Sequence, residues 1–257
     1  MTDTQTTSPL RVAVIGARGR MGSQAVEAVG NAPDMEVVAQ IGRGDSLDAM
    51  LDANATHMVD LSVPSATADN VAFAIEHGIH AVVGATGWDA DRLAAVRTQL
   101  EGQPEVGVLI ATNFALGAVL AAQFAAQAAP YFESVEVIEM HHPDKVDAPS
   151  GTADRTARMI AQARAEAGRA PSPDATETDP HGARGAVVDD VHVHAVRLRG
   201  LVAHQEVLLG GEGEMLTIRH DSFDRVSFMS GVLLGLRTVA QRPGLTHGLE
   251  GYLDLGA

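Results

Sequence analysis

Cysteine is absent from the sequence, and aromatic residues make up only 4% of its 257 residues. The lack of cysteine excludes a disulfide framework, a thiolate metal site and a cysteine nucleophile. The low aromatic content argues against an aromatic-rich recognition surface, whereas abundant alanine and glycine favour helices packed closely on a sheet. Hydrophobic residues account for 46% of the chain, which is enough for a substantial core and too much for a disordered protein.

Long apolar segments are also missing. No apolar run reaches the roughly 18 residues that a membrane-spanning helix needs. The N-terminal segment MTDTQTTSPL has neither the basic start nor the apolar core of a secretory signal. These observations predict a cytoplasmic protein without a membrane partner.

Positive charge is scarce, because 18 Lys and Arg residues stand against 33 Asp and Glu residues, for a formal net charge of −15. Such a surface repels nucleic acid and anionic membranes at long range, so neither is expected as a partner. An anionic ligand then requires a locally basic site. The few clusters of Arg, Lys and His therefore carry most of the information about function.

The first half of the chain alternates between apolar runs and helical patterns. The run at 10–15 stops at Gly16, which is typical of a strand buried on both faces. A helix to about Gly30 and a strand at 36–41 complete a βαβ unit. Further strands are predicted at 57–62, 79–84 and 106–111, and helices at 67–77 and 89–100. This alternation predicts a doubly wound parallel sheet, a Rossmann domain, over residues 1–112.

The pattern changes after Asn113 and predicts a second, mixed α/β domain with an open sheet over residues 113–224. Its expected elements are helices at 116–129 and 152–167, a strand at 134–142, a long loop at 171–185 and strands at 191–198, 202–209 and 215–220. The short connections between the last three strands predict antiparallel neighbours. A helix at about 230–240 is expected to return residues 225–257 to the first domain.

The segment GARGRMG places three glycines, Gly16, Gly19 and Gly22, between the first strand and the first helix. The first permits a tight turn, the second a close approach to a pyrophosphate, and the third close packing of helix on strand. The helix N-terminus offers free N–H groups and partial positive charge to phosphates. Taken alone, the motif is also compatible with a purely structural glycine-rich turn. Its position in the first βα turn favours dinucleotide binding.

The end of the second strand bears on the choice of cofactor. An acidic residue there normally binds the adenine ribose. Here Gly42 and Arg43 follow the strand, and no carboxylate comes before Asp45. Arg43, together with Arg18 and Arg20, can form a phosphate-binding cluster, although all three arginines can also be solvated surface charges. The pattern favours NADPH, with NADH also possible.

The segment EMHHPDKVDAPSGTA, Glu139–Ala153, combines groups suited to an anionic substrate. A histidine such as His141 can exchange a proton near neutral pH. Lys145 supplies a positive charge, and Gly151 and Thr152 present donors at a helix start. Each group alone has a plausible structural role, but their combination predicts a site for a small carboxylate substrate.

This segment resembles the signature E-[LIA]-HH-x-x-K-x-DAPSGTA of the 4-hydroxy-tetrahydrodipicolinate (dihydrodipicolinate) reductases. The resemblance extends over essentially the whole chain. It includes the glycine turn, GATG at 84–87, ATNF at 111–114, HAVRLRGLVAHQEV at 194–207 and RHDSFDR at 219–225.

The resemblance implies an enzyme of the diaminopimelate route to lysine, which transfers hydride from NADPH or NADH to ring carbon C4 of a cyclic imine dicarboxylate. It implies a homotetramer assembled through the open sheets. His141 and Lys145 are implied to serve proton transfer, and His142, Lys145, Gly151 and Thr152 to bind the substrate. The implied cofactor-binding residues are Gly16, Ala17, Arg18, Gly19, Arg20, Met21, Arg43, Gly84, Ala85, Thr86, Ala111, Thr112, Asn113 and Phe114.

The sequence departs from the family pattern at three of these places. Ala85 replaces a threonine, which removes a hydroxyl near the expected nicotinamide. Thr112 stands where proline or alanine is usual. Gly42 stands where many members carry the acidic ribose ligand, which again favours NADPH.

Other function classes share part of the pattern. A Rossmann oxidoreductase for another imine or carbonyl needs the glycine turn but not the segment 139–153. A nonenzymatic nucleotide sensor needs no acid and lysine beside a helix start. His192 and His194 share a strand face, but no nearby carboxylate or cysteine completes a ligand set, so no metal is expected.

Overall fold

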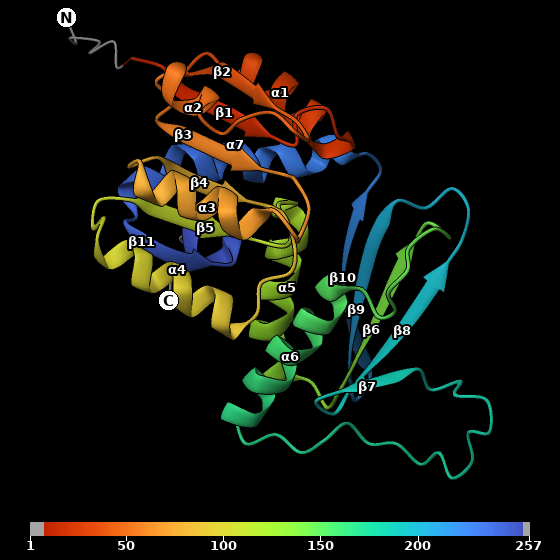
Figure 1. Cartoon of the computed structure of the whole chain (residues 1–257). Coiled ribbons are helices and arrows are strands. Elements are labelled where there is room, and N and C mark those ends of the chain that lie inside the picture. The colour runs from red at the N-terminus through yellow and green to blue at the C-terminus, as the bar shows by residue number, and fades with distance from the viewer. Residues whose placement is uncertain (1–7, 254–257) are drawn as a thin grey trace, which may run out of the picture. The chain divides into compact units, whose positions relative to one another are not determined.

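The computed structural model describes residues 8–253. The chain forms two compact units (Figure 1). The first unit combines the residues up to Phe114 with those from Phe228 onward, and the second contains Ala115–Ser227. None of the helices in the described range is long and apolar enough to cross a membrane.

The first unit is built on a six-stranded sheet with the order β11-β5-β4-β3-β1-β2, in which every pair is parallel. Its strands are β1 Leu10–Ile15, β2 Met35–Ile41, β3 His57–Asp60, β4 His80–Val83, β5 Gly107–Ile110 and β11 Gly244–His247. The predicted parallel sheet is confirmed. The sequence reading did not predict β11, which adds the C-terminal segment to the edge next to β5.

Helices cover both faces of this sheet. They are α1 Arg20–Gly30, α2 Ala49–Asp52, α3 Thr67–Glu76, α4 Ala90–Glu101 and α7 Met229–Thr238, with short 3-10 turns at Val239–Gln241 and Leu249–Tyr252. A further 3-10 turn, Arg225–Phe228, spans the boundary between the two units in the sequence. Helices α3 and α4 contact each other, as do α1 and α7, which gives the two layers of a doubly wound fold. Gly235 allows α7 to lie close to the sheet, because a Cβ there would already lie 3.0 Å from Leu109 and 3.1 Å from Val82.

The chain leaves four adjacent strands at one edge of the sheet. Leu61 N donates to Ile15 O, Gly84 N to Asp60 O and Ala111 N to Val83 O. The segments after β1, β3, β4 and β5 therefore start side by side at the carboxyl edge. Open α/β sheets bind their ligands at this edge.

The second unit contains a five-stranded mixed sheet with the order β10-β9-β6-β8-β7. Its strands are β6 Ser134–His141, β7 Ala186–Val188, β8 Val191–Arg197, β9 Ala203–Gly211 and β10 Glu214–Ser222, and its helices are α5 Leu116–Ala128, α6 Gly151–Glu166 and the 3-10 turn Ala129–Tyr131. Alternate residues of β6, such as Val135 and Val137, are buried against small residues of both helices, including Ala125 and Ala157. One sheet face is thus packed, and no helix of this unit within the described residues covers the other (Figure 1).

One predicted pairing in this sheet is wrong. Strands β8 and β9 are joined by a short connection, but β6 lies between them, parallel to β8 and antiparallel to β9. The connection passes over the end of β6, where Leu198 N donates to His141 O at 3.0 Å. A short loop reaches across one intervening strand, so its length does not show that its two strands are neighbours. The predicted pairing of β9 with β10 is correct.

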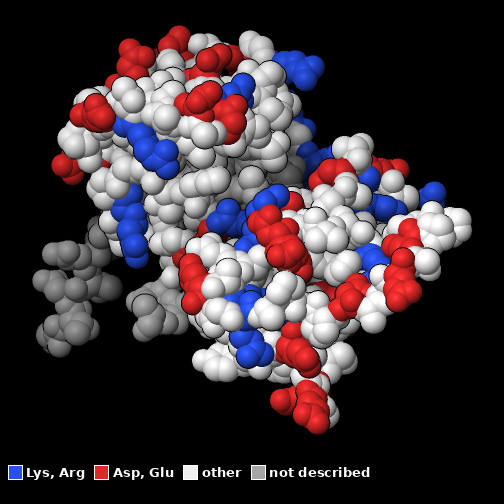
Figure 2. All heavy atoms as spheres, turned by 90° about the horizontal axis from the view of Figure 1, so that it is seen from below, with Lys and Arg blue, Asp and Glu red and all other residues white. Residues whose placement is uncertain are grey.

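On the face that Figure 2 shows, Asp and Glu alternate with Lys and Arg, and the described residues form no broad basic patch there. The basic groups that serve an anionic ligand must therefore be local.

Candidate active site

The turn between β1 and α1 has the backbone geometry that its glycines predict. Gly16 has a φ of +79°, and a Cβ at this position would lie 2.7 Å from the carbonyl oxygen of Leu61. A Cβ on Gly22 would overlap the carbonyl oxygen of Gly16, so α1 approaches β1 as closely as glycine allows. Gly19 caps α1 without a side chain. The first N–H groups of the helix are thereby left for an anionic ligand.

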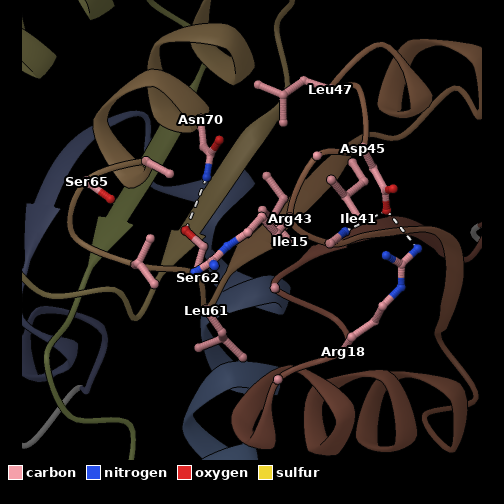
Figure 3. Close-up of a pocket in the computed structure, with 16 residues that line it drawn as sticks. Ile15, Arg18, Ile41, Arg43, Asp45, Leu47, Leu61, Ser62, Ser65 and Asn70 are labelled. Atoms are coloured by element: carbon pink, nitrogen blue, oxygen red, sulfur yellow. Dashed lines mark hydrogen bonds and ion pairs between the residues drawn. The ribbon is translucent and has the colours of Figure 1, made fainter.

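A pocket of ≈ 660 Å³ opens beside this turn (Figure 3). It is bounded by the ends of β1, β2 and β3 and by the start of α3. Its lining residues are Ile15, Gly16, Arg18, Gly19, Ile41, Gly42, Arg43, Gly44, Asp45, Leu47, Leu61, Ser62, Val63, Ser65, Ala66 and Asn70. Two of the three predicted arginines, Arg18 and Arg43, line the pocket. Arg20 is exposed and is not among the lining residues.

Asp45, to which the sequence assigned no role, brings a carboxylate into the same pocket. Gly44, with a φ of +86°, turns the chain back on itself. The Asp45 carboxylate then accepts hydrogen bonds from Gly42 N and from the Arg18 guanidinium, each at 2.9 Å. Arg18 is therefore already paired, whereas no carboxylate within residues 8–253 pairs with Arg43. A glycine, an arginine and a second glycine directly before an aspartate were the sequence signal for this turn.

The segments after β4 and β5 lie farther along the same edge. A Cβ on Gly84 would lie 2.6 Å from the end of the Leu61 side chain and 3.1 Å from the Phe114 ring, so a larger residue there would displace these side chains. Ala85, Ala111 and Phe114 are buried, and Thr86 and Thr112 are exposed. The edge is therefore lined mainly by backbone and small side chains.

In the second unit, the predicted catalytic segment begins at the end of β6 and surrounds the buried carboxylate of Glu139. His141 Nδ1 lies 2.6 Å from Glu139 Oε2. Arg197, opposite His141 on β8, donates to both carboxylate oxygens at 2.7 Å. Ser150 N donates to Oε1 at 3.1 Å. Four hydrogen-bond donors thus surround the carboxylate of Glu139, whose side chain is 0% exposed.

The loop after β6 returns Lys145 to the same region. Lys145 Nζ donates to the two oxygens of Asp147 at 2.8 and 3.0 Å, and the backbone oxygen of Asp147 accepts from Arg197 at 2.7 Å. The peptide bond between Ala148 and Pro149 is cis. The loop thus connects back to the cluster around Glu139.

Helix α6 begins at the end of this loop. Ser150 is its N-cap, and its side chain accepts from Ala153 N at 3.2 Å. Gly151 is exposed, and a Cβ there would meet no other atom within 4 Å, so its surroundings are open. Thr152 follows on the first turn, and His142 is half-buried at the end of β6. All four predicted substrate-binding residues therefore lie in the stretch that connects β6 to α6.

Burial and neighbouring charges determine the protonation states of His141 and Glu139. Burial lowers the pKa of His141; the hydrogen bond and charge of Glu139 oppose this, and the charges of Lys145 and Arg197 lower it further. Burial would raise the pKa of Glu139, but hydrogen bonds from Arg197 and His141 outweigh it and hold that pKa below its ordinary value. Glu139 is therefore ionised, and the His141 ring loses its proton readily.

Comparison with known proteins decides the family. A model described as the N-terminus of dihydrodipicolinate reductase matches residues 10–114, and one described as its C-terminus matches residues 117–253. The chain belongs to the dihydrodipicolinate reductase family. The prediction made from Glu139–Ala153 is thereby confirmed.

Relatives and solved structures agree with this membership. The 4-hydroxy-tetrahydrodipicolinate reductase of Streptomyces griseus is 64% identical over 248 residues, which cover 96% of this chain and 99% of the relative. The reductase of Nocardia farcinica is 59% identical over 246 residues, with 96% and 99% covered. A dipicolinate-bound dihydrodipicolinate reductase from Paenisporosarcina sp. TG-14 has a TM-score of 0.85 and 37% identity, and covers 95% of this chain and 100% of its own.

Two residues of this reductase-family site, Glu139 and Arg197, received no role from the sequence. Glu139 was visible only as part of the motif. Arg197 lies 58 residues further along the chain and reaches Glu139 through the pairing of β8 with β6. A signal did exist, because the buried Val191 and Val193 lie an even number of positions before Arg197 on β8, so all three share one face of the strand.

The sequence-based statement about His192 and His194 needs a correction. Glu136 accepts from His194 Nε2 at 2.7 Å, and Asp174 lies 3.4 Å from His192 Nε2, so carboxylates do lie beside both histidines. Arg184 donates to both of these carboxylates. In the described part of the chain, no group of three or more His, Asp and Glu side chains is arranged to hold a metal ion.

Proposed function

We propose that this chain reduces 4-hydroxy-tetrahydrodipicolinate to tetrahydrodipicolinate, with a nicotinamide cofactor, in the diaminopimelate route to lysine. The observation that carries the proposal is the convergence of His141, Lys145 and the start of α6 around Glu139 in a chain of this family. The reaction adds one hydride and one proton to the substrate and releases one water. The cofactor supplies the hydride to ring carbon C4 when it is bound.

The side chains of the second unit fit the remaining tasks. His142, Lys145 and the Gly151–Thr152 helix start offer positive charge and N–H donors to the two substrate carboxylates. His141 supplies the proton from Nε2, because its Nδ1 is held by Glu139. Lys145 has three N–H donors and can bind a carboxylate while keeping Asp147. Positive charge near the ring also stabilises the electrons that hydride addition pushes towards the ring nitrogen.

The direct test is an assay with freshly prepared substrate, run in parallel with NADPH and NADH. Absorbance at the nicotinamide band should fall only when chain, substrate and reduced cofactor are all present, and tetrahydrodipicolinate should accumulate in equal amount. Binding of the cofactor without consumption would support a nucleotide sensor. Consumption with a different imine only would support another oxidoreductase.

For the cofactor, we propose a preference for NADPH, with NADH also accepted. The pocket beside Gly16 holds the adenine ribose, and Arg43 extends into it from the end of β2 without a carboxylate partner within residues 8–253 (Figure 3). The remaining proposed cofactor-binding residues follow the family pattern at the carboxyl edge, except Ala85 and Thr112. The Asp45 carboxylate opposes this preference, because it repels a 2′-phosphate and accepts hydrogen bonds from ribose hydroxyls. The preference therefore depends on Arg43.

Replacing Arg43 by alanine tests this assignment. Arg43→Ala should weaken NADPH binding by about 1–3 kcal/mol and leave NADH binding nearly unchanged, since only NADPH carries the phosphate that loses its charge-assisted contact. Titration calorimetry with both cofactors measures the difference. Arg97→Ala, which removes an exposed arginine from α4, is the control for net charge. An equal loss for both cofactors would show that Arg43 does not bind the 2′-phosphate.

We also propose that the chain assembles as a homotetramer through the open face of the second sheet, in the cytoplasm, where amino-acid biosynthesis takes place. The apolar side chains on that face are Ile138, Met140, Val187, Val196, Leu208 and Met215. Val196 is 37% exposed and Met215 66% exposed in the single chain. Covering such a face with a second copy removes apolar area from water.

Light scattering after gel filtration tests the assembly. The mass should correspond to four chains of 26.8 kDa each, and Met215→Glu should shift it towards smaller species, because it puts a charge into an apolar contact. Leu51→Glu, at an exposed position of the first unit, is the matched control. A monomer at all concentrations would refute the proposal.

A further inference from the structure

Glu139 occupies an unusual position for a carboxylate. It follows Val135 and Val137 on the packed face of β6, and it is 0% exposed. Removing a carboxylate from water is costly unless strong partners replace the solvent. An apolar residue would continue the core here without that cost. Packing alone therefore does not account for a carboxylate at this position.

The partners of Glu139 come from three separate elements. Arg197 binds it with two parallel hydrogen bonds from β8, in the bidentate geometry that fixes orientation. His141 approaches from the same strand, and Ser150 N from the start of α6. The Glu139 carboxylate thus fixes the end of β6, the adjacent strand β8 and the start of α6 relative to one another.

The same network reaches Lys145. The Arg197 guanidinium that binds Glu139 also donates to the backbone oxygen of Asp147 at 2.7 Å. The carboxylate of Asp147 in turn holds Lys145 Nζ at 2.8 Å. A displacement of Arg197 would therefore move the loop that carries the lysine.

We propose that Glu139 is a positioning residue of the reductase, which holds the His141 ring with its proton on Nδ1 and, through Arg197, keeps Lys145 in place. The inference rests on the proposed function, in which His141 gives a proton from Nε2. Nε2 has no hydrogen-bond partner within residues 8–253. A hydrogen bond to one ring nitrogen fixes which nitrogen exchanges the proton. The negative charge of Glu139 also offsets Lys145 and Arg197 when the ring is protonated.

The variant Glu139→Gln keeps the shape but removes the charge. We expect kcat to fall about 10–100-fold with a small change in KM, as for other groups that orient a functional histidine. Because Glu139 favours the protonated ring, its loss lowers the pKa of His141, and the decline of kcat with rising pH should move to lower pH. A purely structural role would reduce stability without moving the pH profile.

A control variant is available on the same strand. Glu136 lies on the opposite face of β6 and also pairs with one histidine and one arginine, His194 at 2.7 Å and Arg184 at 2.6 Å. Glu136→Gln likewise removes the charge of a carboxylate that binds one histidine and one arginine, but on the face assigned to the tetramer contact. It should keep the wild-type mass in light scattering and leave both kcat and its pH profile unchanged. If both variants behave alike, the special role of Glu139 is refuted.

A double-mutant cycle separates this inference from the proposed function. If Glu139 acts through His141, the losses in Glu139→Gln and His141→Gln should not add in the double variant. Additive losses, or a normal kcat and pH profile in Glu139→Gln, refute the positioning role. A normal kcat in His141→Gln refutes instead the proposed proton donor.

The unmodified protein offers a test in which a variant serves only to assign the signal. Nitrogen-15 NMR of labelled histidine, with His141 assigned by its loss in His141→Gln, reports which ring nitrogen carries the proton. A neutral ring protonated on Nδ1 supports the inference. A ring protonated on Nε2 overturns it.

Discussion

Replacing His141 by glutamine should lower kcat by about 100–10,000-fold, the range for loss of a general acid. The ring is placed for proton transfer because Glu139 occupies Nδ1 and leaves Nε2 free for exchange. Glutamine preserves the size and polarity of the side chain but cannot deliver a proton at neutral pH. KM should change little, because the substrate carboxylates are assigned to other groups.

The pH profile gives the second part of this prediction. Burial, Lys145 and Arg197 lower the pKa of His141, so in the free protein the protonated ring is lost as pH rises through a value below 6.5. A reaction that needs the protonated ring then slows with rising pH. In His141→Gln this dependence should disappear, which steady-state kinetics between pH 5 and 9 will measure.

The variant Lys145→Ala should be compared with His141→Gln. It should raise KM and lower kcat together, because Lys145 is assigned both to carboxylate binding and to the charge that develops during hydride addition. His141→Gln should instead act mainly on kcat. If His141→Gln keeps a near-native kcat and a normal pH profile, the proton comes from Lys145 or water, and His141 only positions the substrate.

The sequence was most informative where function depends on local backbone geometry. The apolar runs, the glycines of the first turn and the motif at 139–153 predicted the Rossmann sheet and the family, since each signal lies within a few neighbouring residues. The contact of the Asp45 carboxylate with Gly42 was not predicted, because it depends on the positive φ of Gly44. Its effect on the cofactor depends on a turn that apolar periodicity does not reveal.

Most of the features that the sequence did not predict depend on the pairing of strands that are far apart in the chain. The place of β6 between β8 and β9, and thus the contact of Arg197 with Glu139, depends on sheet order rather than on loop length. Strand β7 has three residues, and β11 has four, of which three are partly buried and one is exposed, so neither shows a strong apolar period. Such short edge strands are defined by their partners.

A buried histidine far from the motifs leads to the last prediction, a loss of stability in mild acid. His57 in β3 is 4% exposed, its Nδ1 lies 2.8 Å from the Thr56 hydroxyl, and its ring centroid lies 5.0 Å from that of His80. Burial, and secondarily the charge of His80, lower the pKa of His57 from 6.5 to about 4. The ring is therefore neutral in the folded protein at pH 7.

Proton binding determines in which direction the free energy of unfolding changes with pH. Below pH 6.5 the unfolded chain binds a proton at His57, whereas the folded protein does so only near pH 4. The contribution of this group to the free energy of unfolding is thus fully present above pH 6.5 and is lost as pH falls towards 4. The loss amounts to about 3 kcal/mol in total, of which about 2 kcal/mol is lost by pH 5. His80, whose pKa burial also lowers, adds in the same direction.

Urea unfolding of the wild-type chain and of His57→Leu at pH 7.5 and pH 5.0 measures this contribution. Leucine cannot titrate, so the variant should lose about 2 kcal/mol less between the two pH values than the wild type does. Comparing each protein with itself cancels the packing change that the substitution causes at both pH values. If the two proteins lose the same free energy, His57 is protonated in the folded state without penalty, and acid sensitivity must come from other groups.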